Sequence, residues 1–594
     1  MINRIGLLLL LCGIATGAAS EVEGPASEVR ITLTSQAAKA VADLGLDVPV
    51  TGRVFVIVSR DGDEEPRLGT GVTGNPLWGI DVRGLGGGDS VILSSDAASF
   101  RGYPLEDFDE LPPGDYHVQA FLNVYTTFHR ADGHVVEAHL NSGAFQNPFK
   151  APGNAHSEVR RITVGDDGLP TLELAIDQVI QPPRPLEDGE VLQQGNFADT
   201  EWVRYVKIRS EKLSEFWGRD MYIGANVLLP PGYDPEGDER YPVLYMQGHS
   251  SGFTPMPWAP EEWFVPGYEP GHPAVGPQLD GFYEAWTAGE LPRFVIITFR
   301  DANPYFDTSY SVNSPNVGPY GDALTEELMP YLEENFRIVD EPWGRVLAGR
   351  STGGWEAAAM MVFYPELFAV SYPWAPDPID FRKLMQIDIY NFGNAFVNEL
   401  EWLRTPLPAQ RETDGLVNYH VADEHAYEQT IATYDRSGGQ WAIWQALYSP
   451  VGDNGYPVPL WDPDTGVIDP DVAAYWKENW DLSHIIARDW PTLGPKLQGK
   501  LHFAVGRRDN YYLEQAVYLT EQRMAELENP DAGATFQYGI NGRHSWIGHS
   551  PADPSQQMKY REFIGVIGRF VAGQAPADAD IAHWQVPAKG REQP

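Results

Sequence analysis

Cysteine is almost absent from this sequence, and the only one among its 594 residues is Cys12. It lies within residues 1–19, where Arg4, a leucine-rich centre and the small residues Gly17 and Ala19 are typical of a secretory signal peptide. We therefore expect a mature chain with no disulfide, no thiol nucleophile and no cysteine-bound metal. A signal peptide also predicts a location in a periplasm or outside the cell.

Long apolar runs and basic residues are scarce as well. The leucine-rich stretch of the leader is too short to cross a bilayer, and no other stretch is long enough, so we expect no membrane span. The 42 basic residues are outnumbered by 83 acidic ones, which gives a formal net charge of −41. This charge repels phosphate backbones, so nucleic acid is not an expected partner.

The motifs of several cofactor-dependent enzymes are missing. The chain has neither the H-E-x-x-H pattern of zinc peptidases nor the G-x-x-x-x-G-K loop that cradles nucleotide phosphates. The segment DPDTG at 462–466 begins like a calcium loop but lacks the later glutamate, so it predicts a turn. We expect no metal and no cofactor.

Length and composition predict a globular chain of two to four domains, because 43% of the residues are hydrophobic. Residues 21–180 show short alternating runs separated by Gly, Pro and Asp, which favours an all-β sandwich of immunoglobulin-like type. In LPPGDYHVQAFLNVYTTF, every second residue from Val118 to Val124 should share one face of a strand. The segment SQAAKAVADLG is a possible helix. The proline-led residues 181–200 read as a linker or a wrapping segment.

From residue 201 to 575 the pattern changes to buried strands that alternate with helical segments, which predicts a parallel sheet covered by helices on both faces. Residues 378–495 form an aromatic-rich insertion, which we expect to be mostly helical and to lie over the carboxyl edge of the sheet. It could build a substrate pocket, or it could be a structural cap without substrate contact. Residues 576–594 would form a C-terminal tail.

A serine between glycines stands at the point where one of these strands becomes a helix. Gly349–Gly353 matches G-x-S-x-G, after the apolar RVLA and before the helical GWEAAAMMVFY. A serine hydroxyl is a weak nucleophile, so it must be exposed on a tight turn near a base and near N–H donors. The alternative is a simple glycine-rich helix N-cap, but the strand-to-helix context favours Ser351 as a nucleophile.

In this arrangement the acid and the histidine follow the serine along the chain. Asp509 ends the strand KLHFAVGRRD, where it could also cap the next helix. His544 follows the strand ATFQYGI, and Gly542 would give its loop the freedom to reach Ser351. His549 lies in the same loop and is the alternative, but His544 is nearer to the end of the strand.

Catalysis at a serine also needs two backbone N–H groups that bind the oxyanion. One would come from Thr352, directly after the nucleophile. The other would come from His249, in the loop after the strand YPVLYMQ. The alternative for this second loop is an ordinary glycine turn.

Five segments together resemble a known family: RYPVLYMQGH, YGDALTEELMPYLEENFRI, LAGRSTGGWEAAAMMVFYPELFAVSYPWAPDP, GRRDN and GRHSW. They are similar to the Putative esterase family of α/β-hydrolases, the esterase D-like group that also holds feruloyl, acetylxylan and enterochelin esterases. The resemblance covers roughly residues 201–575. It implies an α/β-hydrolase domain and metal-independent hydrolysis of a carboxylic ester through a seryl acyl-enzyme, with Ser351 as nucleophile, His544 as base and Asp509 as its orienting acid.

Our primary interpretation is therefore a secreted serine esterase acting on a small-molecule or carbohydrate-linked ester. One alternative is a serine peptidase of the prolyl-oligopeptidase kind, although no propeller repeats are visible. The other is a glycan-binding protein with a catalytically retired hydrolase domain. The sequence leaves the acyl group, the alcohol and the oligomeric state open.

Overall fold

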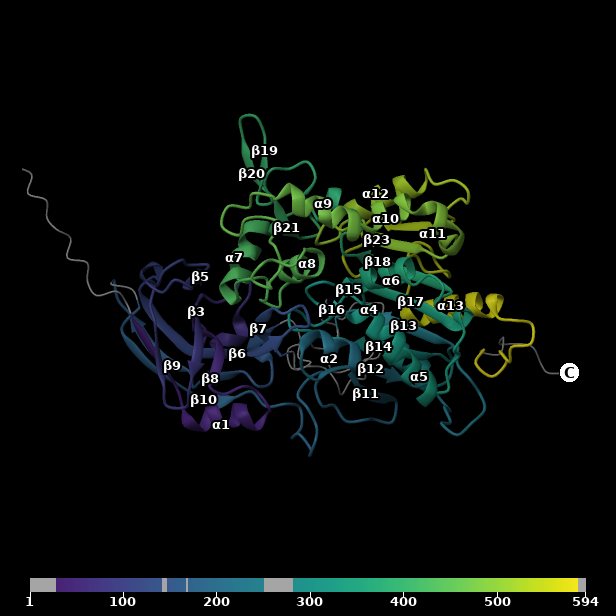
Figure 1. Cartoon of the computed structure of the whole chain (residues 1–594). Helices are drawn as coiled ribbons and strands as arrows, with labels where there is room; N and C mark the ends of the chain where they lie inside the picture. The colour runs from purple at the N-terminus through teal and green to yellow at the C-terminus, as the bar shows by residue number, and fades with distance from the viewer. Residues whose placement is uncertain (1–27, 141–146, 167–168, 250–280, 586–594) are drawn as a thin grey trace, which may run out of the picture.

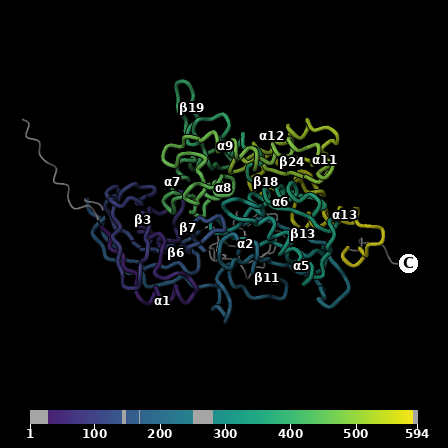
Figure 2. The backbone as a smooth tube through the Cα atoms, viewed as in Figure 1, coloured from purple at the N-terminus to yellow at the C-terminus, as the bar shows by residue number. Residues whose placement is uncertain are grey.

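The computed structural model describes residues 28–140, 147–166, 169–249 and 281–585. The expected signal peptide therefore lies outside the described residues. A β domain is formed by the N-terminal part of the chain, and an α/β domain lies beside it (Figures 1 and 2). Within the described residues, no helix combines the length and the apolar character needed to cross a membrane.

The β domain is one hydrogen-bonded network of ten strands in the order β4-β1-β10-β8-β6-β2-β3-β5, with β7 and β9 also paired to β6. Its strands are β1 (Val29–Leu33), β2 (Val50–Ser59), β3 (Leu77–Leu85), β4 (Ser90–Leu93), β5 (Arg101–Tyr103), β6 (Gly114–His129), β7 (Val135–His139), β8 (Ala155–Ser157), β9 (Arg160–Val164) and β10 (Leu172–Val179). The possible helix forms as α1 (Ser35–Asp43). The immunoglobulin-like type stays a prediction.

Strand β6 has two apolar faces that serve different purposes. Val118, Ala120, Leu122 and Val124 share one face and are buried in the main hydrophobic core, as their spacing predicts. On the other face, Phe121 belongs to a second, smaller cluster that also contains Ile431 of the insertion. On this face, the β domain therefore packs against the insertion.

Residues 181–200 form no helix or strand but pack closely against the α/β domain. Gln194 is 2% exposed. Its Nε2 donates to the carbonyls of Tyr222 and Ala302 at 2.9 and 2.8 Å. This contact fits the wrapping segment that was one of the two interpretations.

The α/β domain contains an eight-stranded sheet in the order β11-β12-β14-β13-β17-β18-β23-β24. Only β12 runs antiparallel to its neighbours, and the remaining neighbours pair in parallel. The strands are β11 (Val203–Ser210), β12 (Met221–Leu228), β13 (Val243–Gln247), β14 (Val295–Arg300), β17 (Arg345–Ser351), β18 (Val370–Pro376), β23 (His502–Gly506) and β24 (Thr535–Gly539). This order and direction are those of an α/β-hydrolase, so that fold prediction is confirmed.

Helices cover both faces of this sheet. On β18, Ser371 donates to the carbonyl of Ala357 in α6, whereas the next residue, Tyr372, packs its ring 5.1 Å from Phe563 in α13. Because successive side chains of a strand point to opposite faces, α6 and α13 lie on opposite sides. The helices of the domain are α2 (Glu211–Trp217), α3 (Phe282–Thr287), α4 (Tyr320–Ala323), α5 (Met329–Asn335), α6 (Thr352–Phe363), α12 (Glu514–Met524) and α13 (Tyr560–Gln574).

The segment between β18 and β23 runs along the upper side of the molecule in Figure 1, from above the junction with the β domain to helices beside β23. Its helices are α7 (Val421–Ile431), α8 (Gln440–Tyr448), α9 (Pro470–Asn479), α10 (Leu482–Arg488) and α11 (Trp490–Leu497). It also holds two short hairpins, β19 (Val397–Glu399) with β20 (Arg404–Pro406), and β21 (Pro408–Arg411) with β22 (Val417–His420). Helix α7 contacts β3 and β5 of the β domain, so the insertion joins the two parts of the chain.

Candidate active site

Ser351 is the last residue of β17 and directly precedes α6. Its backbone has φ 60° and ψ −126°, a conformation that non-glycine residues rarely adopt. Such strain persists only where the surrounding structure enforces it, and it is concentrated at functional sites. The sharp strand-to-helix turn that the sequence predicts is therefore present.

The glycines around Ser351 allow α6 to lie against the strands. A Cβ atom on Gly353 would come within 2.1 Å of the carbonyl oxygen of Gln247, and one on Gly349 within 2.1 Å of the Gly353 carbonyl oxygen. A Cβ on Gly354 would come within 2.6 Å of the Trp374 carbonyl oxygen. Since backbone atoms cannot move aside, only glycine fits at these positions.

Asp509 and His544 are in direct contact. Asp509 follows β23, His544 follows β24, and Nδ1 of His544 lies 2.8 Å from Oδ2 of Asp509. The Asp509 side chain is 0% exposed, and its Oδ1 accepts the backbone N–H of Tyr511 at 2.8 Å. A buried carboxylate at Nδ1 favours the imidazole tautomer whose Nε2 is free to accept a proton.

The role expected of Gly542 is different in the structure. A Cβ atom there would lie 2.9 Å from the Cα of Gly506, and one on Gly506 would lie 2.3 Å from the carbonyl carbon of Gly542. The two glycines let the turns after β23 and β24 touch, which brings Asp509 and His544 together. Close packing, not loop freedom, explains this glycine.

His549, the alternative base, does not contact Asp509 through any recorded hydrogen bond or ion pair among the described residues. Its backbone N–H donates to Oε1 of Gln537 at 2.9 Å, and its ring packs 4.9 Å from Trp546. Of the two histidines, His544 is the one that the structure places beside an acid.

Ser351, His544 and His249 line one cavity of about 560 Å³. The insertion contributes Glu424 from α7 and three side chains from α8, namely Gln440, Trp441 and Trp444. The insertion is thus part of the cavity wall, which was one of the two interpretations of its aromatic sequence. Met385 of the insertion also lines the cavity, and the other lining residues are Met246, Gln247, Gly248, Arg350, Asp377, Tyr511, Leu513 and Tyr560.

A second carboxylate contacts the serine, and the sequence reasoning did not single it out. Oδ1 of Asp377 accepts the hydroxyl of Ser351 at 3.3 Å, and Oδ2 accepts the hydroxyls of Tyr310 at 2.7 Å and Thr352 at 3.0 Å. Gln440 of the insertion also donates to Oδ2, at 3.2 Å. Burial raises the pKa of Asp377, while these donors and the nearby histidines act against that shift. The only feature of the sequence that could have pointed to Asp377 is its position directly after strand β18.

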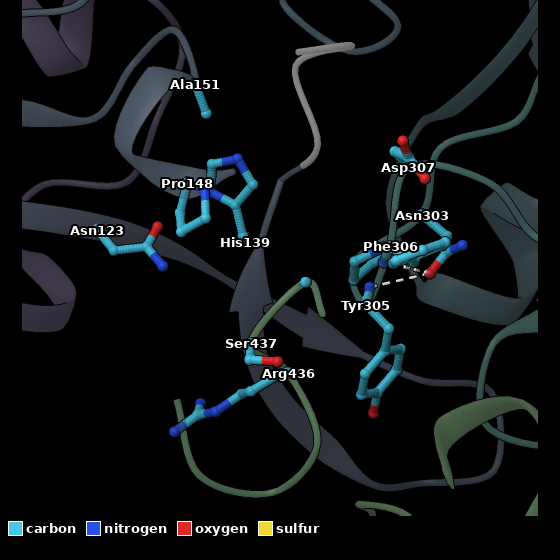
Figure 3. A pocket seen from close by; sticks show the side chains of 12 residues that line it. Asn123, His139, Pro148, Ala151, Asn303, Tyr305, Phe306, Asp307, Arg436 and Ser437 are labelled. Carbon is cyan, nitrogen blue, oxygen red and sulfur yellow. Dashed lines mark hydrogen bonds between the residues drawn. The ribbon is translucent and has the colours of Figure 1, made fainter. Parts of the chain in front are cut away.

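The imidazole of His249 is held by an acid from a different loop. Its Nδ1 lies 3.2 Å from Oδ1 of Asp307. Burial lowers the pKa of His249, but the negative charges of Asp307 and Asp377 outweigh burial and raise it overall. Asp307 also lines a small cavity between the domains, together with His139 of β7 and Arg436 of the insertion (Figure 3). The loop that carries Asp307 therefore lines a cavity to which the β domain and the insertion also contribute.

The described residues contain no group of three or more His, Cys, Asp or Glu side chains arranged to hold a metal ion. The chemistry that the cavity offers is that of a serine, an imidazole and backbone N–H groups. Thr352 begins α6 directly after Ser351, and His249 lies two residues after β13 and lines the same cavity as Ser351.

One family model matches part of the chain. The model of the family described as Putative esterase matches residues 214–424, which include Ser351 and Asp377. The endo-1,4-beta-xylanase/feruloyl esterase of Xylanibacter ruminicola is 29% identical over 147 residues, covering 24% of this chain and 18% of that protein. The uncharacterized protein YbbA of Bacillus subtilis is 24% identical over 152 residues, covering 24% of this chain and 52% of YbbA. The chain thus spans a fifth to about half the length of these relatives.

Two solved structures are also similar. A ferulic acid esterase aligns with 63% of this chain and 98% of its own, at 15% identity and a TM-score of 0.34. An S-formylglutathione hydrolase from Staphylococcus aureus aligns with 63% of this chain and 98% of its own, at 13% identity and a TM-score of 0.29. These likenesses are weak, and the fold assignment rests on strand order and direction.

Proposed function

We propose that this chain, whose residues 214–424 match the model of the Putative esterase family, is a serine hydrolase that cleaves carboxylic esters through Ser351, His544 and Asp509. The observation that carries the proposal is the 2.8 Å contact between His544 and Asp509 at the wall of the cavity that also holds Ser351. The strained turn at Ser351 supports it, because such a turn exposes a nucleophile.

The proposed reaction has two halves. His544 Nε2 removes the proton of the Ser351 hydroxyl as Oγ attacks the ester carbonyl carbon, and the tetrahedral oxyanion collapses as His544 returns the proton to the leaving alcohol. Water then attacks the acyl-serine with His544 again as base, and collapse releases the carboxylic acid and restores the serine. Asp509 keeps the imidazole in its tautomer and stabilises its charged form.

We assign the oxyanion site to the backbone N–H groups of Thr352 and His249. Donors aimed at the position of the developing negative charge contribute several kcal/mol to a typical acyl transfer, roughly 3 to 4 per donor. The positive imidazole that Asp307 favours on His249 would add a further favourable charge close to this site. No step needs a metal or a cofactor.

The substrate that we propose is a small-molecule or carbohydrate-linked ester, and one relative carries feruloyl esterase in its name. We further propose that the protein acts in a periplasm or outside the cell, because residues 1–19 read as a signal peptide. Both proposals are tested separately from the mechanism, by a substrate panel and by fractionation of the producing cells.

Labelling of the mature protein with a fluorophosphonate, followed by intact-mass measurement, tests the nucleophile. We expect one adduct on the wild type and none on Ser351→Ala, together with turnover of short p-nitrophenyl esters by the wild type only. The matched control is Ser99→Ala in the β domain, which should label and turn over like the wild type. Turnover that survives in Ser351→Ala would exclude Ser351 as the nucleophile. Folded wild type without adduct or turnover would favour a binding protein.

A further inference from the structure

Three hydrogen-bond donors in the cavity of Ser351 have no partner in the described part of the chain. They are Nε2 of Gln247, Nη1 of Arg350 and the hydroxyl of Tyr560. Tyr560 is 1% exposed and Gln247 is 2% exposed, so bulk water does not compensate for the missing bonds. A buried donor without an acceptor is unfavourable, so three in one cavity mark a place built for an acceptor.

Arg350 and Tyr560 lie on the same face of the sheet. Arg350 of β17 pairs in register with Trp374 of β18, so the two side chains point the same way. The ring of Trp374 lies 5.8 Å from that of Tyr560, the first residue of α13. Burial raises the pKa of Tyr560, and the positive charge of Arg350 only partly offsets this, so the phenol keeps its proton and acts as a donor.

The two acids of the cavity do not neutralise Arg350. None of the ion pairs among the described residues includes Arg350. Asp377 is already bound by Ser351, Thr352, Tyr310 and Gln440. Glu424 accepts from the indole of Trp441 at 2.9 Å, and burial raises its pKa to about 8, so it is largely uncharged near neutral pH. A guanidinium beside the nucleophile therefore lacks a counter-charge.

We propose that the ester cleaved at Ser351 also carries a free carboxylate, which is bound by the guanidinium of Arg350 and the hydroxyl of Tyr560. This proposal rests on the proposed function and adds the class of substrate. Arg350 directly precedes the nucleophile, so the carboxylate lies a few bonds from the scissile ester, on its acyl or its alcohol side. Both residues are specificity-determining and take no part in proton transfer.

A carboxylate fits this site better than a phosphate or a sulfate. The guanidinium of Arg350 and the phenol of Tyr560 can each donate to one carboxylate oxygen, the amide of Gln247 can donate to either of them, and Arg350 supplies the single positive charge. A phosphate dianion would bring a second negative charge close to Asp377. The large negative net charge of the chain also disfavours a highly charged ligand.

Two matched substrate pairs test the proposal. On the acyl side, the 4-nitrophenyl monoester of adipic acid is compared with the 4-nitrophenyl ester of adipic monoamide, after subtraction of uncatalysed hydrolysis. On the alcohol side, 4-acetoxybenzoate is compared with 4-acetoxybenzamide. We expect the wild type to prefer the carboxylate in at least one pair by tenfold or more in kcat/KM, because a site built for a charged group rejects its neutral analogue.

The ratio of the two kcat/KM values is the readout for variants. Arg350→Gln should bring the ratio close to one, and Tyr560→Phe should lower it about threefold to tenfold. The control Arg161→Gln, on the exposed strand β9, should leave the ratio at the wild-type value. If neither pair shows a preference in the wild type, or if Arg350→Gln keeps the wild-type ratio, the proposal is wrong.

A binding measurement separates this proposal from the mechanism. In Ser351→Ala protein, 4-hydroxybenzoate and adipate are compared with their amides by thermal shift, and the same is done with Ser351→Ala/Arg350→Gln. A shift with a carboxylate that is lost with Arg350→Gln supports the site even if no ester is turned over. Ester turnover with neither a thermal shift nor a preference for the carboxylate substrates would support the proposed esterase function and show that the carboxylate site is wrong.

Discussion

Nδ1 of His544 lies 2.8 Å from Oδ2 of Asp509, although the two residues are 35 positions apart in the chain. Asp509 is fully buried and the side chain of His544 is 20% exposed, so one partner is fixed in the core and the other reaches the cavity. The turns after β23 and β24 make this possible, because Gly506 and Gly542 let the two backbones touch.

Asp509→Asn should abolish most of the activity without unfolding the protein. The amide keeps the shape of the carboxylate but stabilises the imidazolium poorly and favours the wrong tautomer of His544, so we expect kcat to fall by about 10³ to 10⁴. Steady-state kinetics with a p-nitrophenyl ester measures this. Asp464→Asn, whose side chain is 76% exposed, is the control and should behave like the wild type. A loss of less than about tenfold would remove Asp509 from the catalytic machinery.

Asp377→Asn should have a smaller effect of a different kind. Asp377 accepts the Ser351 hydroxyl at 3.3 Å, and the amide can keep only part of the contacts of its two oxygens. We expect kcat to fall about tenfold with little change in KM, and the rate of fluorophosphonate labelling to fall with it. If Asp377→Asn were as damaging as Asp509→Asn, the assignment of the orienting acid would have to be reconsidered.

Gly353→Ala should prevent correct folding around Ser351. The added methyl group would lie 2.1 Å from the carbonyl oxygen of Gln247 and 2.6 Å from the backbone nitrogen of Gly248, so α6 would have to move away from β13. We expect loss of soluble protein or a large fall in thermal midpoint. In Gly573→Ala, near the end of α13, the methyl meets nothing within 4 Å, and the helix should gain about 0.5 to 1 kcal/mol. Equal midpoints for both variants would contradict this explanation of the glycine.

Asp435 should make the protein less stable as the pH rises. The residue is 3% exposed, and burial, reinforced by Glu428, raises its pKa from 3.8 to about 8. Between pH 3.8 and about pH 8, Asp435 is protonated in the folded state but ionised in the unfolded state. The contribution of the protonated side chain to the free energy of unfolding is therefore complete below about pH 4, falls as the pH rises, and is lost by about pH 8.

Asp435→Asn removes this titration while keeping the shape. Asn also tolerates the φ of 55° at this position. We expect the stability gain of the variant over the wild type to grow with pH, by up to about 1.4 kcal/mol per unit, until about pH 8. Urea unfolding at pH 5, 6, 7 and 8 measures it, with Asp464→Asn as the control. A difference that does not change with pH would mean that Asp435 is charged in the folded state.

The sequence was informative wherever a local pattern carries the geometry. A serine between glycines at a strand-to-helix boundary predicts a turn because no other residues fit there, and chain order then points to Asp509 and His544. Asp377 was not foreseen as a partner of Ser351, because its contacts to Tyr310 and to Gln440 of α8 join residues 67 and 63 positions apart in the chain. Arg350 was visible within the motif, but only the packing shows that its buried nitrogen has no acceptor.

The packing of β6 also makes the insertion depend on the β domain. Phe121, on the face of β6 that points away from the main core, shares an apolar cluster with Ile431 of the insertion. The insertion in turn supplies Gln440 and Trp444 to the wall of the cavity. Loss of the β domain would expose this cluster and remove the surface on which α7 rests. We therefore expect that removing the β domain would destabilise the insertion and, through it, the wall of the cavity.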